Sequence, residues 1–129
     1  MEESRLRTYS PQTFAFLGDA VYGMYMREYV VTAANCPAKK LHAKTIKYVS
    51  AAGQARAIEK IEPELTEEEQ DVYRRGYNTK TANSAKNATL EDYHKATGFE
   101  ALIGYLHLKG DSARVRELIE KAIEINGKI

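Results

Sequence analysis

The stretch Phe14-Ala15-Phe16-Leu17-Gly18-Asp19-Ala20-Val21 decides the fold, because it places one carboxylate in a long run of uncharged residues. From residue 8 to residue 26 the only formal charge is Asp19, and from residue 96 to residue 108 it is Glu100. Both runs are predicted to be helices of a buried core. The neighbours predicted to form that core are Phe16, Leu17, Val21 and Met24 around Asp19, and Phe99, Leu102, Ile103 and Leu106 around Glu100.

A carboxylate in such surroundings needs a partner, because Asp and Glu are almost never fully buried alone. The partner could be a Lys or Arg side chain or the N–H groups of a helix N-terminus. If both carboxylates face one cleft, they could instead hold a hard cation such as Mg²⁺, which uses one or two protein carboxylates. The two helices also contain Gly18, Gly23, Gly98 and Gly104, whose presence in helices suggests close approach by another helix or by a ligand.

Helix start and stop signals divide the rest of the chain. Helices are predicted from Pro11 to about residue 31, from Pro37 to about residue 61 with a break near Val49-Ser50, from a capping box at Thr66 to about residue 77, over 89–108, and over 111–126. Residues 79–88 are predicted to be a loop. No segment alternates strictly enough for a strand. The sequence therefore predicts an all-α fold of about six or seven helices, with residues 1–129 forming a single domain.

The composition is that of an ordinary globular chain, with 129 residues of which 43% are hydrophobic and 29% charged. The single cysteine, Cys36, excludes an intramolecular disulfide and a zinc site made of cysteines. No apolar run is long enough to cross a membrane, and the N-terminus lacks the pattern of a signal peptide. These features lead us to expect a cytoplasmic protein without a membrane partner.

The net charge of +1 conceals local concentrations of charge. Residues 38–60 carry a local charge of +5 and residues 74–95 a local charge of +3, whereas acidic residues cluster over 59–71. A basic segment rich in amide side chains suits the phosphates of a nucleic acid, although most charged strips are simply solvated faces. The residues of the second strip that could contact phosphates are Arg74, Arg75, Asn78, Lys80, Lys86 and Asn87.

Two motifs resemble the ribonuclease III family. Residues 14–21 resemble the family's signature, whose core reads Leu-Glu-Phe-Leu-Gly-Asp, and Gly98-Phe99-Glu100-Ala101-Leu102-Ile103-Gly104 looks like its other metal-binding helix. Ala15 and Thr97 stand where that family has further carboxylates. These departures match the short Mini-ribonuclease III subfamily, and Arg75-Gly76-Tyr77-Asn78-Thr79-Lys80 is similar to that subfamily's Arg-Gly-Arg-Asn-Ala-Lys run.

The resemblance implies a ribonuclease III-like endonuclease domain without a double-stranded-RNA-binding domain. It implies a Mg²⁺-dependent endoribonuclease, with Mn²⁺ as a possible substitute, that cleaves double-stranded RNA and matures precursor large-subunit (23S) ribosomal RNA. Asp19 and Glu100 would be the catalytic and metal-binding residues. A homodimer is implied, with the apolar helix at residues 11–31 as its interface, and a ribosomal protein would help to present the substrate.

Two other functions remain open at this stage. The losses at Ala15 and Thr97 suggest a non-catalytic RNA-binding or ribosome-associated module that retains the fold. A helical protein-interaction domain would also be consistent with the composition. Cleavage of duplex RNA separates the first of these from the enzyme, and RNA binding at low salt separates the second.

Overall fold

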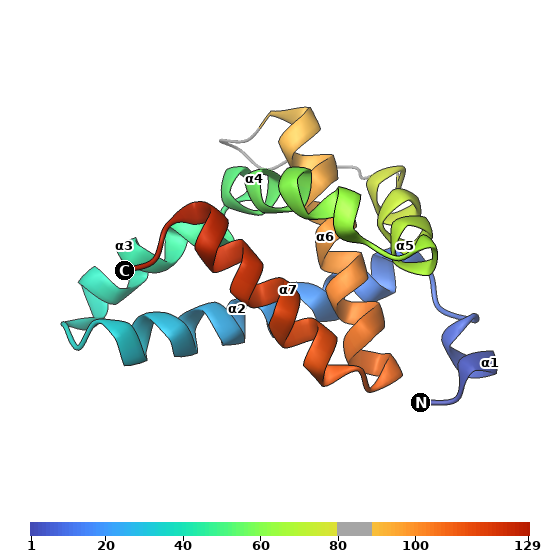
Figure 1. Ribbon diagram of the computed structural model, residues 1–129, viewed down its shortest axis with the longest axis horizontal. Coiled ribbons are helices and arrows are strands. Elements are labelled where there is room, and N and C mark those ends of the chain that lie inside the picture. The colour runs from blue at the N-terminus through green and yellow to red at the C-terminus, as the bar shows by residue number, and fades with distance from the viewer. Residues whose placement is uncertain (80–88) are drawn as a thin grey trace.

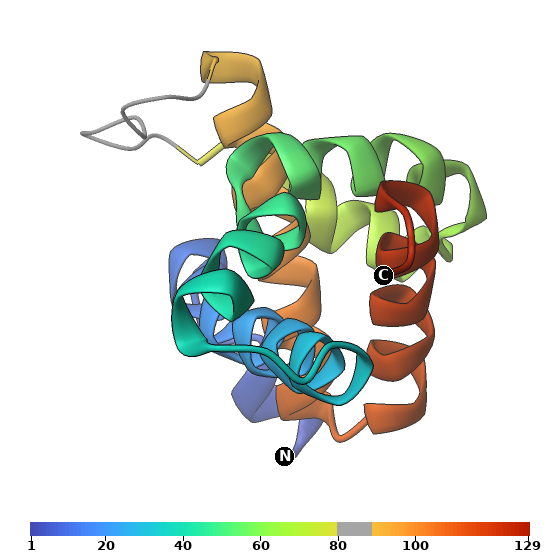
Figure 2. The ribbon, with the colours of Figure 1, turned by 90° about the vertical axis from the view of Figure 1, so that its left-hand side faces the viewer.

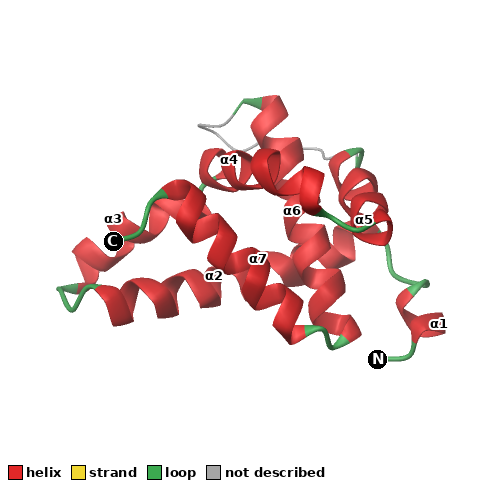
Figure 3. Ribbon diagram, viewed as in Figure 1, coloured by secondary structure: helices red, strands yellow, loops and turns green. Residues whose placement is uncertain are grey.

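The computed structural model describes residues 1–79 and 89–129, and within them it contains seven α-helices, one short 3-10 helix and no strand (Figures 1 and 3). The elements are α1 (Glu3–Leu6), α2 (Pro11–Ala33), α3 (Ala38–Val49), α4 (Ala51–Ile61), η1 (Glu62–Glu64), α5 (Glu67–Tyr77), α6 (Leu90–Lys109) and α7 (Ser112–Asn126). The predicted all-α class is confirmed. No helix in the described ranges is both long enough and apolar enough to span a membrane.

Side-chain caps account for most of the helix starts. The hydroxyl oxygens of Ser10, Ser50, Thr66 and Thr89 each accept a hydrogen bond from a backbone N–H in the first turn of their helix, as does the carboxylate of Asp111. Ser50 is at once the C-cap of α3 and the N-cap of α4, which gives the predicted break between these helices. The four-residue helix α1 was not predicted, because it is too short to show a periodic pattern.

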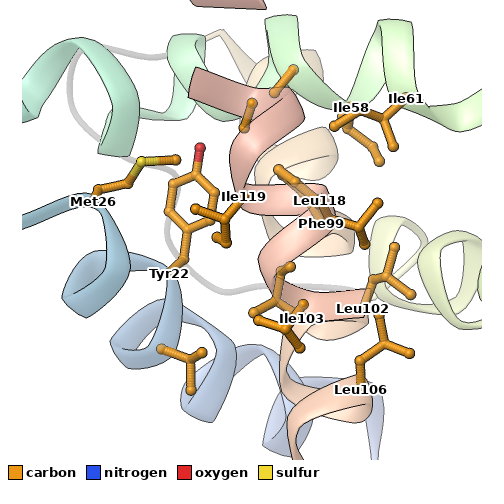
Figure 4. Close-up of a cluster of buried hydrophobic side chains, with 14 of the residues drawn as sticks. Tyr22, Met26, Ile58, Ile61, Phe99, Leu102, Ile103, Leu106, Leu118 and Ile119 are labelled. Carbon is orange, nitrogen blue, oxygen red and sulfur yellow. The ribbon is translucent and has the colours of Figure 1, made fainter. Parts of the chain in front are cut away.

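Helix α6 is the central element, and α2, α4, α5 and α7 all pack against it. In Figure 1 it runs down the middle of the molecule, with α2 behind it, α7 in front, α4 crossing its upper part and α5 to the right. Phe99, Leu102, Ile103 and Leu106 of α6 lie in the main cluster of buried side chains, as predicted (Figure 4). Burial of each such side chain contributes about 1.5–3 kcal/mol to folding.

Two glycines allow α2 and α6 to cross in direct backbone contact. A Cβ atom at Gly18 would collide with the carbonyl oxygen of Glu100, and one at Gly104 would collide with the carbonyl oxygen of Phe14. On another side of α6, a Cβ atom at Gly98 would lie 2.7 Å from the ring of Tyr73 in α5. The glycines therefore mark helix-to-helix approach.

Gly23 is different from these, because the nearest atom to its missing Cβ is a guanidinium nitrogen of Arg27 one turn further along α2.

The prediction that Phe16 and Met24 belong to the core is wrong. Phe16 is 84% exposed and Met24 is 54% exposed, whereas Val21 is buried and Leu17 is partly buried. Because α2 is apolar on several sides, its sequence does not show which side the rest of the chain covers.

The acidic residues at 59–71 are joined to the body of the protein by ion pairs. Glu59 accepts from Lys95 at 2.5 Å, Glu68 from Lys109 at 3.0 Å and Glu64 from Lys121 at 2.7 Å. The cations come from α6 and α7, so the acidic run is partly neutralised within the fold. Lys95 is thereby removed from the basic strip predicted over residues 74–95.

The most enclosed of these ion pairs joins α5 to α7. Arg114 donates two hydrogen bonds of 2.9 Å to the carboxylate of Glu69, which is 5% exposed and also accepts from the backbone N–H of Thr66 at 2.9 Å. Burial alone would raise the pKa of Glu69, but the hydrogen bonds and charge of Arg114 and the bond from Thr66 outweigh it and lower the pKa. This carboxylate is therefore ionised at neutral pH and needs its arginine.

We expect Arg114→Met to lower the free energy of unfolding at pH 7 by about 3 kcal/mol, because it leaves a buried carboxylate without its cation. Urea denaturation measures this loss. The difference from wild type shrinks as the pH falls through the range in which Glu69 takes up a proton, since a neutral carboxyl needs no cation. Arg7→Met is the matched control: Arg7 pairs with Glu3 on the surface, so this change costs less than about 0.5 kcal/mol. Equal losses in the two variants would contradict the structural role of Arg114.

Candidate active site

The glycine contact between α2 and α6 brings the two isolated carboxylates together. Asp19 follows Gly18 directly, and the missing side chain of Gly18 leaves room for the backbone of Glu100. The side chain of Asp19 is close enough to that of Glu100 to raise the pKa of Glu100. Asp19 is exposed and Glu100 is partly buried, so the pair lies at the surface end of the helix crossing. The structure therefore brings together the two carboxylates that stand alone in their apolar runs.

The environment of Glu100 favours its neutral form. Burial is the largest cause, followed by the hydrogen bond with Asp19 and the negative charge of Asp19, and together they raise the pKa of Glu100 to about 8. A hydrogen bond from Gln54 opposes the shift. In the metal-free protein the neutral carboxyl of Glu100 is therefore favoured at neutral pH. Both groups can be ionised together only when a positive charge lies beside them.

The corner between α3 and α4 forms the wall of the site next to Glu100. The last carbonyls of α3 lack helical partners and are bound by side chains: Tyr22 donates to the carbonyl oxygen of Tyr48 at 3.1 Å, and Gln54 donates to that of Val49 at 3.1 Å. The same Nε2 of Gln54 lies 3.4 Å from Oε2 of Glu100. Gly53 is required in this corner, because a Cβ atom there would collide with the carbonyl oxygen of Lys47.

These residues fit a divalent cation. A pair of carboxylates that cannot both be ionised alone is the donor set that a hard, oxygen-seeking ion would neutralise, and Mg²⁺ is commonly bound through one or two carboxylates. A third oxygen is near, because the amide of Gln54 contacts Glu100. Its Oε1 is buried and has no hydrogen-bond partner. Among the residues that the structure describes, no three His, Cys, Asp or Glu side chains form a cluster that could hold a metal. Asp19 and Glu100 could hold such an ion as a pair, with water filling the other positions.

The residues predicted to contact RNA are only partly described. Arg74 pairs with Asp71 at 3.1 Å and lines a hollow of about 500 Å³ with Tyr73 and Tyr77. Arg75 lines a different hollow, beside Phe14 and Tyr105. The two arginines are exposed but do not share one hollow. Asn78 is the exposed C-cap of α5, while Lys80, Lys86 and Asn87 lie outside the described residues.

Sequence reasoning missed Gln54. A signal was present, because Gln54 lies four and seven positions before Ile58 and Ile61 and so shares the apolar face of α4. A glutamine on an apolar face must find partners inside the protein. The hydrogen bonds to Val49 and Glu100 are those partners.

Comparison with known proteins identifies this arrangement of helices and carboxylates. Residues 12–111 match the family model described as the Ribonuclease III domain.

The chain belongs to the ribonuclease III family.

Within the family it falls with the Mini-ribonuclease 3 proteins. It is 43% identical to the Mini-ribonuclease 3 of Thermoanaerobacter sp. (strain X514), over 90% of this chain and 82% of that protein, and 42% identical to that of Clostridium tetani, over 93% and 80%. A crystal structure of a Fusobacterium nucleatum protein has a TM-score of 0.83 and 28% identity, covering 90% of this chain and 89% of that one.

Membership of the ribonuclease III family makes this protein an endoribonuclease. Ribonuclease III enzymes act on double-stranded RNA and generally use a divalent metal ion. The two departures from the family pattern have a clear structural setting. Ala15 lies in a small apolar cluster with Leu6, Phe14 and Ala101, and the Thr97 hydroxyl donates to the carbonyl oxygen of Tyr93 at 3.0 Å. Both positions are buried. This chain therefore has fewer carboxylates at the site than the family pattern, and the two replacing residues are packed into the protein.

The raised pKa of Glu100 makes the metal-free protein less stable as the pH rises. The folded protein retains a proton that the unfolded chain loses near pH 4.3, so stability falls between about pH 5 and pH 8. Glu100→Gln cannot ionise, so we expect this variant to be more stable than wild type at pH 8, by on the order of a few kcal/mol, with little difference at pH 4. Thermal melting in EDTA measures both profiles. Parallel profiles for the two proteins would show that Glu100 is ionised throughout.

Proposed function

We propose that this protein is a Mg²⁺-dependent endoribonuclease that cleaves double-stranded RNA as a homodimer, with Asp19 and Glu100 as its catalytic and metal-binding residues. The observation that carries the proposal is the carboxylate pair at the crossing of α2 and α6. Among the described residues, burial and Asp19 raise the pKa of Glu100, and the group that opposes them is Gln54, which carries no charge. A divalent ion is the partner that would let both groups be ionised at neutral pH.

When bound, the ion supplies Lewis-acid chemistry: it lowers the pKa of a water molecule for attack on phosphorus and offsets negative charge on the leaving oxygen. The protein's own part is to prepare the site. Asp19 and Glu100 would provide oxygen ligands, and Glu100 would have to release its proton to solvent to act as an ionised ligand. The glycine crossing sets the spacing of the two carboxylates, and the α3–α4 corner orients Glu100 through Gln54.

RNA would be held by its backbone. We propose that Arg74, Arg75, Asn78, Lys80, Lys86 and Asn87 contact phosphates of the duplex. A-form RNA is recognised mainly by shape, phosphates and 2′-hydroxyls, so sequence preference is modest. The basic face of α3 supports this reading, since Lys39, Lys40, Lys44 and Lys47 are exposed there. Binding through phosphates is expected to weaken steeply with added salt.

The decisive test uses Asp19→Asn, which keeps the size of the side chain and removes its charge. We expect wild-type protein to cleave duplex RNA in Mg²⁺. The variant loses more activity than the roughly 100-fold typical of an outer-shell change at a metal site. Its melting temperature changes little, because Asp19 is exposed and asparagine keeps a side-chain oxygen that can face Glu100. Gel assays of RNA cleavage and thermal melting give the two readings.

Asp111→Asn is the matched control, because Asp111 caps α7 and asparagine is an equally good cap. This variant should cleave RNA at the wild-type rate. Duplex RNA left intact by well-folded wild-type protein would favour the non-catalytic RNA-binding module instead. A large loss of stability in Asp19→Asn would identify Asp19 as a structural partner.

The homodimer is proposed from the uncovered face of α2. Phe16, Ala20, Met24 and Val31 are exposed and recur on one side of the helix. Near the end of that face, a hollow of about 230 Å³ is lined by residues of α2 and α3, among them Val30, Val31 and Leu41. Two copies related by a two-fold axis would run their α2 helices antiparallel, with Phe16 of each copy over this hollow of the other. Burial of both phenylalanine rings would then stabilise the pair.

We expect Phe16→Asp to yield a monomer at micromolar concentration, where wild-type protein is a dimer, because it removes the ring whose burial against Val30, Val31 and Leu41 would stabilise the pair. Light scattering coupled to gel filtration gives the masses. Leu90→Asp is the control: Leu90 is 63% exposed but belongs to the first turn of α6, where an aspartate suits the helix. The dimer interface is located elsewhere if Phe16→Asp keeps the wild-type mass.

We further propose that the RNA substrate is precursor large-subunit (23S) ribosomal RNA in the cytoplasm, presented with the help of a ribosomal protein. The support for this is the resemblance to Mini-ribonuclease III. Incubation of the purified enzyme with precursor 23S RNA, with and without ribosomal proteins, tests the substrate and the partner together.

A further inference from the structure

Two polar side-chain atoms in the described part of the chain are buried without a hydrogen-bond partner: Oε1 of Gln54 and Nδ1 of His94. The first lies beside the carboxylate pair. Gln54 is 3% exposed, so bulk water does not hydrogen-bond to this oxygen. Buried polar groups are nearly always bonded, and an exception near a candidate active site calls for a ligand that supplies the missing donor.

The orientation of the Gln54 amide is determined by its neighbours. Its Nε2 faces two acceptors, the carbonyl oxygen of Val49 at 3.1 Å and Oε2 of Glu100 at 3.4 Å. Turning the amide over would set Oε1 against the same two acceptors and lose both bonds. The unpartnered atom is therefore the oxygen.

The location of that oxygen is bounded by covalent geometry. The two terminal atoms of an amide are about 2.3 Å apart, so Oε1 of Gln54 is within about 6 Å of Oε2 of Glu100. A water molecule in the coordination shell of a cation at Glu100 has two protons to donate. Oε1 of Gln54 is a nearby acceptor that is buried and has no other donor, and it could accept a hydrogen bond from such a water.

We propose that Gln54 is a positioning residue of the cation site, with its N–H holding Glu100 in place and its Oε1 accepting a hydrogen bond from a water of the cation's shell. The inference rests on the proposed function, because it needs a divalent ion at Asp19 and Glu100. Groups that orient ligands and bound waters commonly set the affinity of a metal site. The α3–α4 corner places Gln54 there, since Val49 ends α3 and Gln54 lies in the first turns of α4.

A purely structural role is the competing explanation. As a cap for the carbonyl of Val49, Gln54 would stabilise the corner and have no effect on cation binding. That role accounts for one hydrogen bond of Nε2 but gives no reason for a buried acceptor. The two explanations differ in what they predict for metal affinity in the absence of RNA.

The experiment measures binding of Mn²⁺ to the full chain without RNA, by electron paramagnetic resonance and calorimetry, well below the melting temperature. We expect Gln54→Met, which keeps the length and removes both polar atoms, to bind Mn²⁺ at least 10-fold more weakly than wild type. Ser50→Ala is the matched control. It removes the cap of α4 from the same corner without touching Glu100, so it should lose stability but stay within twofold of the wild-type affinity. Wild-type affinity in Gln54→Met would overturn the proposal.

Gln54→Glu provides a second arm, because it keeps the shape of the side chain and an acceptor oxygen. We expect Mn²⁺ to raise its melting temperature at least as much as it raises that of wild type. A smaller rise would contradict the acceptor role, even if Gln54→Met does not fold. Wild-type protein that binds no Mn²⁺ would refute the proposed cation site itself, and cleavage of duplex RNA reports on the enzyme separately.

Discussion

The contact between Gly18 and Gly104 is the constraint on which the rest of the structure depends. It allows α2 and α6 to touch backbone to backbone, and every other long helix then packs around the pair or against α6. The distance between two helices that cross over side chains is normally 8–10 Å, and these glycines reduce it locally. Larger residues at either position would separate Asp19 from Glu100 as well as loosening the core. Both the packing of the fold and the spacing of the candidate site therefore depend on the absence of side chains at Gly18 and Gly104.

The arrangement seen from the side in Figure 2 shows how the layers follow from this crossing. Helices α2 and α3 lie on one side, α7 lies on the other, and α4 closes the top. The corner between α3 and α4 is bound to α2 by the hydroxyl of Tyr22 and to α6 by Gln54. The buried pair of Glu69 and Arg114 joins α5 to α7 on another side of the molecule. Polar contacts thus hold the ends of helices whose middles are held by apolar packing.

Much of this could be predicted from the sequence, for reasons that differ from feature to feature. Asp19 and Glu100 were identifiable because each is the lone charge in an apolar run, and the caps at Ser10, Thr66 and Thr89 follow local rules. The exposure of Phe16 and Met24 could not be predicted, since an apolar residue looks the same whether its own chain or a second copy covers it. Lys95 was assigned to a basic strip because its partner Glu59 is distant in sequence. The contact of Gln54 with Glu100 could not be predicted, because Gln54 is uncharged and the two residues meet only through the tertiary fold.

The two carboxylates come from helices that are far apart in the sequence, with α3, α4 and α5 between them. Closing so long a segment costs chain entropy before the contact gives any return, so the pair forms as a late and non-local event in folding. During synthesis α2 is complete long before α6 exists, and its apolar surface has no partner until α6 emerges. A nascent chain that ends before α6 therefore cannot bring Asp19 and Glu100 together. Any chemistry that depends on this pair is therefore confined to chains that contain both helices.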